Sequence, residues 1–377
     1  MSWNQYSEDR LNEIEQQILS SLYTQYKTFY LPVKLKSGAE EKIWTIALNT
    51  ESTNIPLVMV HGFAAGIGFW CRNLDALSRD RPVYAMDLLG FGRSSRPTFS
   101  NDSSEVEKEM VDGIEVWRRE MKLEKFYLLG HSMGGFLSMS YTLMYPERVA
   151  HLILAEPWGF SDHQHEKPSY WSSLIFSILH IRPLELVRMI GPLGPWLVQR
   201  VRGDIAVKFE DVVEDKSVMP NYVYHCNAQN PTGERAFYSM VWGFGWAKNP
   251  MILRIENLRS DLPITLMFGS QTWVDKSVGY KIREMRHNSF VDVQIIDDTG
   301  HHLYSEQADT FNEIVVNACK LMENDKSRSK DEIKKTFEEV HIDAKSNERI
   351  KRNGICYVEN DHGESSNCHK EENYEVL

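Results

Sequence analysis

A serine, a histidine and a carboxylate follow one another along this chain in an order that supports nucleophilic catalysis. Ser132 stands in the G-H-S-M-G motif of residues 130–134, directly after the apolar run 126–129. A strand, a sharp turn and a helix are predicted here, because glycines on both sides of the serine leave room for a strained turn that presents its hydroxyl. Ser132 is therefore the predicted nucleophile.

A histidine that follows the last strand of the sheet is expected to act as the general base. Residues 291–296 are typical of that strand, and His301 comes after it in a Gly-His step. As a neutral imidazole, His301 would accept the proton of Ser132 during attack. His302 is the neighbouring alternative, because a shift of the loop by one residue would exchange the two rings.

The carboxylate that orients the base should follow the preceding strand, which the apolar run 263–269 predicts. Asp275 lies in the loop after that run and completes the order Ser, Asp, His. Its charge would fix the imidazole tautomer and stabilise the imidazolium ion. Glu156, which follows the predicted strand 149–155, is the alternative acid, whereas Asp87 fits better as part of a structural turn beside the site.

Two backbone N–H groups are expected to bind the oxyanion of the tetrahedral intermediate. Met133 supplies the first, because it directly follows the nucleophile. The second should lie in the loop 61–66 after an early strand, where Phe63 is the first choice and Ala64 the next. His61, in the same loop, is expected to support the backbone by hydrogen bonding rather than to transfer protons.

Four further segments, together with the serine turn, resemble one branch of the α/β-hydrolase family, the abhydrolase-domain four and five branch. They are residues 60–70, 87–97, 157–160 and the segment 222–234. The branch contains a lysophospholipid lipase type and a type that coactivates adipose triglyceride lipase. The resemblance covers about residues 10–322. It implies a mostly parallel central sheet with helices on both faces and an inserted helical cap.

Two positions distinguish this chain within that branch. In vertebrate members of the coactivator type an asparagine replaces the serine of the turn, so the retained Ser132 resembles the lipase type. The branch also carries an H-x4-D pattern, proposed as a lysophosphatidic acid acyltransferase motif, which here runs from His301 to Glu306. A carboxylate near a helix N-terminus, favoured by the helix dipole, is the simpler interpretation of Glu306.

The composition narrows the class of protein. With 42 Lys and Arg against 53 Asp and Glu, the net charge of −11 argues against a nucleic-acid partner. Five cysteines form no C-x-x-C pair and leave one unpaired, which indicates a reducing compartment. The sequence implies no metal site and no cofactor. It has no secretory signal and no run of ~18 apolar residues, so we expect a soluble or peripheral protein.

Four regions are expected from the alternation of strands and helices and from changes in composition. They are an amphipathic and aromatic segment at 1–33, an α/β-hydrolase domain at 34–157 and 251–322, a helical cap at 158–250, and a disordered tail at 323–377. The cap is rich in aromatic residues, and a cap of this kind would exclude water from the site and shape an acyl pocket. Its arginines either bind an anionic headgroup or are solvated surface charges; they are Arg182, Arg188, Arg200 and Arg202.

Apolar residues recur at helical spacing in the N-terminal segment. They are Leu11, Ile14, Ile18, Leu22, Tyr26 and Phe29. This stripe either packs on the domain or, together with Trp3, lies in a lipid interface, and we expect it to attach the protein to lipid droplets or membranes.

These observations predict a serine-dependent lipid acyl hydrolase that acts on (lyso)phospholipids or related glycerolipids. Acyl transfer to lysophosphatidic acid would use the same residues with a different acceptor. The alternative is a binding role, in which the protein coactivates a separate triglyceride lipase on lipid droplets. We expect a cytoplasmic protein that is peripheral on lipid droplets or on intracellular membranes, including mitochondria.

Overall fold

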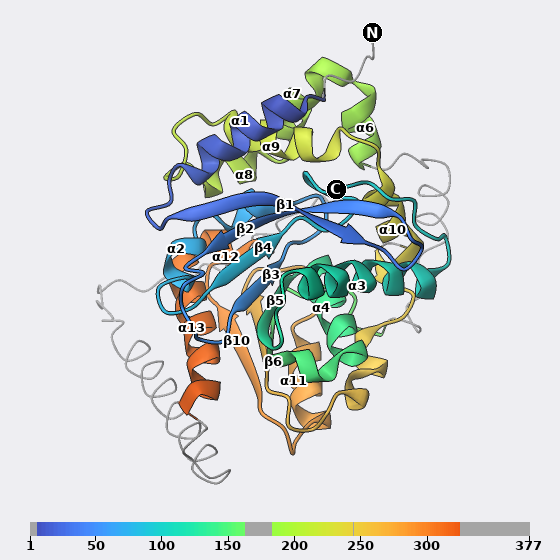
Figure 1. Ribbon diagram of the computed structural model, residues 1–377, viewed down its shortest axis with the longest axis vertical. Coiled ribbons are helices and arrows are strands. Elements are labelled where there is room, and N and C mark those ends of the chain that lie inside the picture. The colour runs from blue at the N-terminus through green and yellow to red at the C-terminus, as the bar shows by residue number, and fades with distance from the viewer. Residues whose placement is uncertain (1–5, 163–182, 244, 325–377) are drawn as a thin grey trace, which may run out of the picture. The chain divides into compact units, whose positions relative to one another are not determined.

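A computed structural model describes residues 6–162, 183–243 and 245–324 (Figure 1). Trp3, Arg182 and the predicted tail beyond residue 324 lie outside the described residues. The described residues up to Met322 group into one compact unit.

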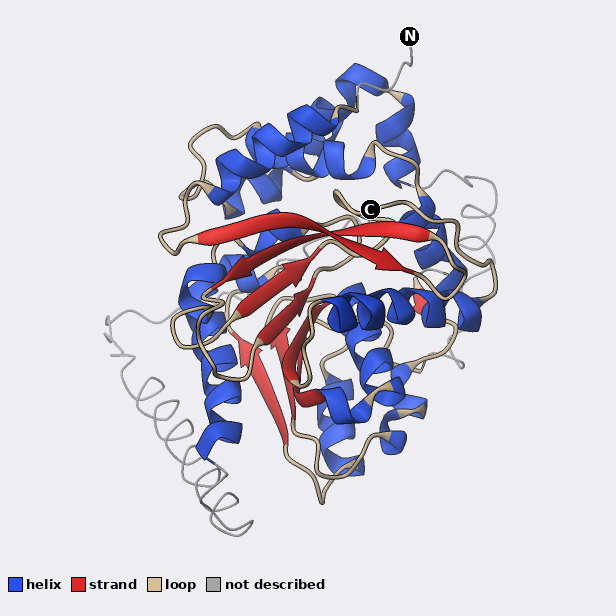
Figure 2. Cartoon of the chain, viewed as in Figure 1, coloured by secondary structure: helices blue, strands red, loops and turns tan. Residues whose placement is uncertain are grey.

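The centre of this unit is an eight-stranded sheet in the order β1-β2-β4-β3-β5-β6-β9-β10 (Figure 2). The strands are β1 Tyr26–Lys34, β2 Glu40–Leu48, β3 Leu57–Val60, β4 Val83–Met86, β5 Phe126–His131, β6 Val149–Ala155, β9 Ile264–Gly269 and β10 Val291–Ile296. β2 pairs antiparallel with β1 and β4, and the other pairs are parallel. The predicted fold class is confirmed.

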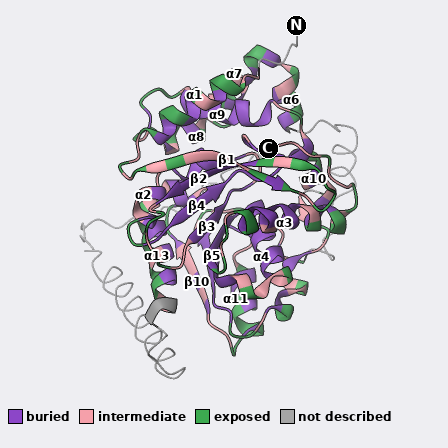
Figure 3. Cartoon of the chain, in the orientation of Figure 1, coloured by how far each residue is buried: buried purple, intermediate pink, exposed green. Residues whose placement is uncertain are grey.

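Alternate residues of the central strands face two separate apolar cores, which is why these strands are continuous apolar runs. Leu57 and Met59 of β3 belong to one core, and Val58 and Val60 belong to the other. The first core also holds residues of α2 Leu74–Leu77, α12 Leu303–Glu306 and α13 Ala308–Asn324. The second holds residues of α3 Ser103–Glu120, α4 Met133–Met144 and α11 Ser277–Met285. The central strands are accordingly buried on both faces (Figure 3).

A helical insertion separates β6 from β9, as predicted for the cap. Its described helices are α6 Pro183–Met189, α7 Gly194–Val201, α8 Gly203–Lys208, α9 Val218–Asn227 and α10 Thr232–Met240. A short hairpin of β7 Val241–Trp242 and β8 Trp246–Ala247 follows them. Residues of α7, α8 and α9 join the same apolar core as α13, so the cap is packed on the hydrolase sheet.

The N-terminal segment is part of this fold rather than a separate region. Its helix, α1 Glu8–Leu19, contacts α9 and lies with the cap helices (Figure 1). Leu11, Ile14 and Ile18 are buried there, so the prediction that they lie in a lipid interface is wrong for these residues. Tyr26 and Phe29 lie in β1, which pairs with β2, so the helical stripe ends earlier than predicted.

A buried carboxylate attaches α1 to the rest of the unit. Glu15 accepts hydrogen bonds from Trp44 Nε1 at 2.7 Å, Arg93 Nη1 at 3.0 Å and the Tyr222 hydroxyl at 3.1 Å. Burial, together with the nearby charge of Asp87, raises the pKa of Glu15 to about 7 despite the Arg93 partner. α1 is therefore connected to β2, to the loop after β4 and to the cap helix α9.

None of the described helices combines the length and the apolarity needed to cross a bilayer. Within the same ranges, no cluster of three or more His, Cys, Asp or Glu side chains is arranged to hold a metal ion.

Candidate active site

Ser132 occupies the sharp turn between β5 and α4 that the sequence predicts. Its backbone has φ 53° and ψ −119°, outside the conformations that most residues adopt. A Cβ on Gly130 would lie 2.4 Å from the carbonyl oxygen of Gly134, and one on Gly134 would lie 2.4 Å from that of Val60. The two glycines are therefore required for the close approach of β5, α4 and β3 that holds Ser132.

His301 lies after β10 with its Nε2 atom 3.0 Å from Ser132 Oγ. Burial, together with the nearby charges of Arg202 and Lys208, lowers the pKa of His301 to about 4. The ring is therefore neutral near pH 7, as a general base must be. The alternative base, His302, points toward Lys208 instead, with Nδ1 at 3.5 Å from Nζ.

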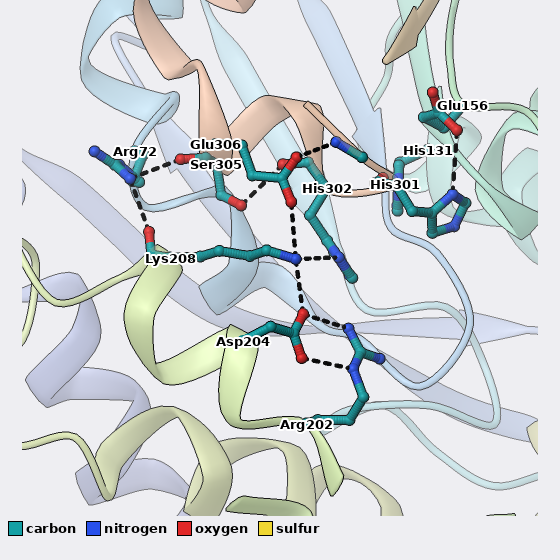
Figure 4. Close-up of polar contacts among 11 residues, drawn as sticks. Arg72, His131, Glu156, Arg202, Asp204, Lys208, His301, His302, Ser305 and Glu306 are labelled. Atoms are coloured by element: carbon teal, nitrogen blue, oxygen red, sulfur yellow. Dashed lines mark hydrogen bonds and ion pairs between the residues drawn. The ribbon is translucent and has the colours of Figure 1, made fainter. Parts of the chain in front are cut away.

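The acid beside His301 is Glu156 rather than Asp275. Glu156 Oε2 lies 3.3 Å from His301 Nδ1 (Figure 4). Asp275 accepts hydrogen bonds from Ser161 Oγ at 3.0 Å and from the Ser277 N–H at 2.9 Å, at the start of α11. The prediction that Asp275 orients the base is therefore wrong, and the alternative that the sequence offered takes its place.

The order of the strands in the sheet explains why Glu156, and not Asp275, lies beside His301. Glu156 directly follows β6, which lies next to β5, so the sheet itself fixes its position close to Ser132. Asp275 stands six residues after the end of β9, and the loop turns it toward α11. An acid at the first position after a strand is the sequence signal for this role.

Glu156 is fully buried and is held from two further sides. It accepts hydrogen bonds from the Gly269 N–H at 2.5 Å and from the hydroxyl of Thr272. Burial raises the pKa of Glu156 to about 7, although both hydrogen bonds oppose the rise by favouring the carboxylate. Because an ionised Glu156 stabilises imidazolium, its protonation state should control the site near neutral pH.

The predicted second oxyanion loop passes beside the nucleophile. A Cβ on Gly62 would lie 2.8 Å from His131 Nδ1 and 3.1 Å from Ser132 Cβ, so the loop backbone is packed on the turn. Phe63 and Ala64 are the next residues, and Ala64 has a left-handed φ of 60°. The assignment of oxyanion binding to the amides of Phe63 and Met133 stays a prediction.

Two polar residues fix this loop, as the sequence predicts. The Leu88 N–H donates to His61 Nε2 at 3.0 Å, so His61 Nδ1 carries the proton and donates to the Gly62 carbonyl at 2.7 Å. Asp87 accepts from the N–H groups of Ile67 at 2.8 Å and Arg93 at 2.7 Å. His61 supports the backbone, and Asp87 belongs to a structural turn.

Sequence reasoning missed the role of His131, which precedes the nucleophile. Its Nε2 atom lies 2.8 Å from the carbonyl oxygen of His301, so the ring donates to the loop that carries the base. Burial lowers the pKa of His131 well below its ordinary value, which keeps the ring neutral. His131 therefore positions the backbone of His301 relative to Ser132.

Glu306, the acid of the acyltransferase-like pattern, contacts Lys208 and the backbone before His301 (Figure 4). Its carboxylate accepts the Gly300 N–H at 2.5 Å and pairs with Lys208 Nζ at 2.8 Å. Glu306 thus binds a backbone donor just before α12, close to the role expected from its sequence position. The ion pair to Lys208 of the cap could not be foreseen, because the two residues are far apart in sequence.

A sheet of this order with a serine on the strained turn after β5 defines the class of α/β hydrolases. The chain belongs to the alpha/beta hydrolase fold family, whose sequence profile matches residues 55–308.

Two groups of relatives are similar over most of their length. The chain is 44% identical over 320 residues to the (lyso)-N-acylphosphatidylethanolamine lipase of Mus musculus, a match that covers 83% of this chain and 92% of that protein. It is 43% identical over 320 residues to the 1-acylglycerol-3-phosphate O-acyltransferase ABHD5 of Mus musculus, covering 83% and 90%. The family branch inferred from the motifs is confirmed.

Solved structures agree on the fold. A membrane phospholipase A, described as a bacterial virulence factor, has a TM-score of 0.60 at 18% identity and covers 84% of this chain and 91% of its own. The carboxylesterase CesB from Bacillus subtilis has a TM-score of 0.54 at 17% identity, with 81% and 96% covered. At these identities the likeness supports the fold alone.

Proposed function

We propose that this protein is a serine-dependent lipid acyl hydrolase that acts on lysophospholipids or related glycerolipids. The observation that carries the proposal is the row of hydrogen-bonded groups from Ser132 Oγ through His301 to Glu156, at 3.0 and 3.3 Å. The name of the lipase relative supports a lipid ester or amide as the substrate.

The proposed reaction has two halves. Ser132 Oγ attacks the acyl carbonyl while its proton passes to His301 Nε2, and the amides of Phe63 and Met133 bind the oxyanion. The proton on His301 then goes to the leaving group, and the acyl group remains on Ser132. Water attacks this ester while His301 takes a proton from the water. His301 then returns the proton to Ser132 Oγ as the bond to the acyl group breaks and the fatty acid leaves. Glu156 stabilises the imidazolium in both halves.

Acyl transfer needs no other residues. A lysophosphatidic acid hydroxyl that replaced water in the second half would receive the acyl group from Ser132, with His301 again taking the proton. The name of the acyltransferase relative supports this variant of the reaction. The contacts of Glu306 with Lys208 and Gly300 favour a structural role for that acid rather than proton transfer to the acceptor.

We also propose that the protein works as a peripheral protein on a cytoplasmic lipid surface, such as a lipid droplet or an intracellular membrane. The support is the exposed apolar side chains of the cap helices, which are Leu193, Trp196, Val201 and Val207. Leu193 ends the 3₁₀ turn Gly191–Leu193 that directly precedes α7, and Trp196 lies in the first turn of α7. Insertion of such side chains would attach an acidic protein to lipid without a polybasic segment.

Fatty acid release from lysophosphatidylethanolamine in mixed micelles tests the hydrolase. Wild-type protein should release fatty acid, and Ser132→Ala should abolish the release. Ser138→Ala, a buried serine six residues further along α4, is the matched control and should be active. Wild-type protein without activity, or equal activity in Ser132→Ala, would contradict the proposal and leave the coactivation of a separate triglyceride lipase as the better account.

A further inference from the structure

A row of alternating charges runs from the cap to the loop that carries His301 (Figure 4). Arg202 donates to Asp204 through Nε at 2.9 Å and Nη2 at 3.1 Å, one contact to each carboxylate oxygen. Lys208 Nζ lies 2.7 Å from Asp204 Oδ2 and 2.8 Å from Glu306 Oε1. Two cations of the cap therefore converge on one carboxylate of the cap.

These cations are close to the catalytic groups. Lys208 Nζ lies 3.5 Å from His302 Nδ1, and the ring centroids of His302 and His301 are 5.6 Å apart. Next to burial, the charges of Arg202 and Lys208 are the main causes that lower the pKa of His301. Lys208 therefore contacts the histidine that neighbours the base, and both cations influence the charge of the base.

Backbone contacts hold this end of α8 against the catalytic loop. Arg72 Nη1 donates to the carbonyl oxygen of Lys208 at 2.7 Å and to that of Ser305 at 2.6 Å. Ser305 follows His301 in the same short segment. Lys208 therefore has a fixed position relative to His301, although it comes from the inserted cap.

We propose that Arg202 and Lys208 bind the phosphate of the substrate's headgroup, at the place that Asp204 now occupies. This inference rests on the proposed function, because it assigns the substrate of the same site to the phosphate-bearing glycerolipids. An ester carbonyl beside Ser132 and a phosphate between Arg202 and Lys208 would be joined by the glycerol backbone.

The geometry around Asp204 is the one that a phosphate would adopt. A guanidinium binds two oxygens of a carboxylate or of a phosphate in the same forked arrangement, and an ammonium adds a third donor. Burial raises the pKa of Asp204, but the hydrogen bonds from Arg202 and Lys208 outweigh burial and lower it to about 2, so Asp204 is an anion at neutral pH. The group that Arg202 and Lys208 hold is therefore an anion, as a phosphate would be.

Exchange of Asp204 for a phosphate is feasible because the pair is accessible. The side chains of Arg202 and Asp204 are 45% and 41% exposed, and ion pairs of such exposure contribute little to stability. Lys208 is more buried, and Glu306 holds it from the other side. Lys208 would thus remain in place while the phosphate displaces the carboxylate of Asp204.

Calorimetric titration of Ser132→Ala protein tests the proposal without turnover. The ligands are an octanoyl lysophosphatidic acid below its critical micelle concentration, octanoylglycerol, and glycerol 3-phosphate. In the Ser132→Ala protein, the additional substitutions Arg202→Met and Lys208→Met together should raise the Kd for lysophosphatidic acid at least tenfold. The Kd for octanoylglycerol should rise by a much smaller factor. Arg202→Met alone should raise the Kd for lysophosphatidic acid by a smaller factor. Because this side chain is exposed, the single variant should fold even if the double variant does not.

The control is Lys216→Met, which removes an exposed cation of the cap that pairs with Glu210 at 3.6 Å. It should leave all three Kd values unchanged. Equal weakening of octanoylglycerol, no weakening of lysophosphatidic acid, or the same loss in Lys216→Met would overturn the proposal. Glycerol 3-phosphate that binds as tightly as lysophosphatidic acid would also overturn it, because the site would then serve a free phosphate compound. Selective phosphate binding with no Ser132-dependent turnover in wild-type protein would refute the hydrolase and retain this site.

Discussion

Glu156 Oε2 lies 3.3 Å from Nδ1 of His301, on the side of the ring opposite the nitrogen that faces Ser132. This contact joins the end of β6 to the loop after β10 through one imidazole. Because the carboxylate is fully buried and held by Gly269 and Thr272, it defines both the orientation of the ring and its charge.

Glu156→Gln should remove the charge that orients His301 and should lower kcat severely, on the order of 10⁴-fold where the imidazole takes the wrong tautomer. Asp275→Asn should keep kcat within a few-fold of wild type, because Asp275 contacts Ser161 and Ser277 instead of the base. Steady-state hydrolysis of a short-chain ester gives both values.

Thermal unfolding of both variants is the control for the fold. A severe loss in Asp275→Asn with near-normal activity in Glu156→Gln would return the orienting role to Asp275.

Activity should rise with pH through a midpoint near 7. Burial raises the pKa of Glu156 to about 7, so the required carboxylate forms only as the pH passes that value. The pKa of His301 is lowered to about 4, so its ring is already neutral across this range and its titration adds no second step there. The pH profile of kcat/KM for a soluble ester measures the midpoint.

Thr272→Val should move this midpoint to higher pH. The hydroxyl of Thr272 donates to Glu156 and lowers its pKa, so removal of the donor raises the pKa of Glu156 further. Thr272→Ser keeps the donor and should keep the wild-type midpoint. A midpoint that stays in place or moves to lower pH in Thr272→Val would show that Glu156 does not control the profile.

Leu11→Ala should destabilise the whole unit by about 2–5 kcal/mol, because the leucine is fully buried in the core. Gln17→Ala, at an exposed position of the same helix, should change the free energy of unfolding by no more than about 0.5 kcal/mol. Urea denaturation compares the two variants. A negligible effect of Leu11→Ala would indicate that α1 detaches from the cap and restore the lipid-interface interpretation of the stripe.

Binding to phosphatidylcholine vesicles should depend on two exposed apolar side chains, Leu193 just before α7 and Trp196 in its first turn. Replacement of Leu193 and Trp196 by serine removes apolar area that would contribute ~25 cal/mol per Å² when it leaves water, so vesicle flotation should fall. Gln199→Ser, on the same helix, should float like wild type. Moderate salt should have little effect, since the attachment is apolar; complete release by salt would point to the cap arginines.

Local motifs and long-range contacts differed in how well the sequence predicted them. Ser132 directly follows β5, and Gly130 and Gly134 are required for the close approach around its turn, so its position follows from neighbouring residues. His301 lies five residues after the end of β10, and the Gly-His step was its signal in the sequence. Asp275 lies six residues after the end of β9, and its contacts with Ser161 and Ser277 turn it away from the base; the sequence does not reveal these contacts.

Contacts made by the inserted cap were beyond sequence reasoning. The helical spacing of α1 correctly indicated an apolar face, but spacing does not reveal which surface covers that face, and the covering surface is the cap. Likewise, the pairing of Lys208 with Glu306 joins residues from two distant segments. Only the folded chain brings these charges together.

Labelling by a fluorophosphonate probe tests the central claim most directly, because the probe reacts only with a serine whose base is in place. Wild-type protein should be modified on the peptide that contains Ser132, Ser132→Ala should not be modified, and Glu156→Gln should react far more slowly than Asp275→Asn. Wild-type protein without modification, or with modification on a different serine, would contradict the account.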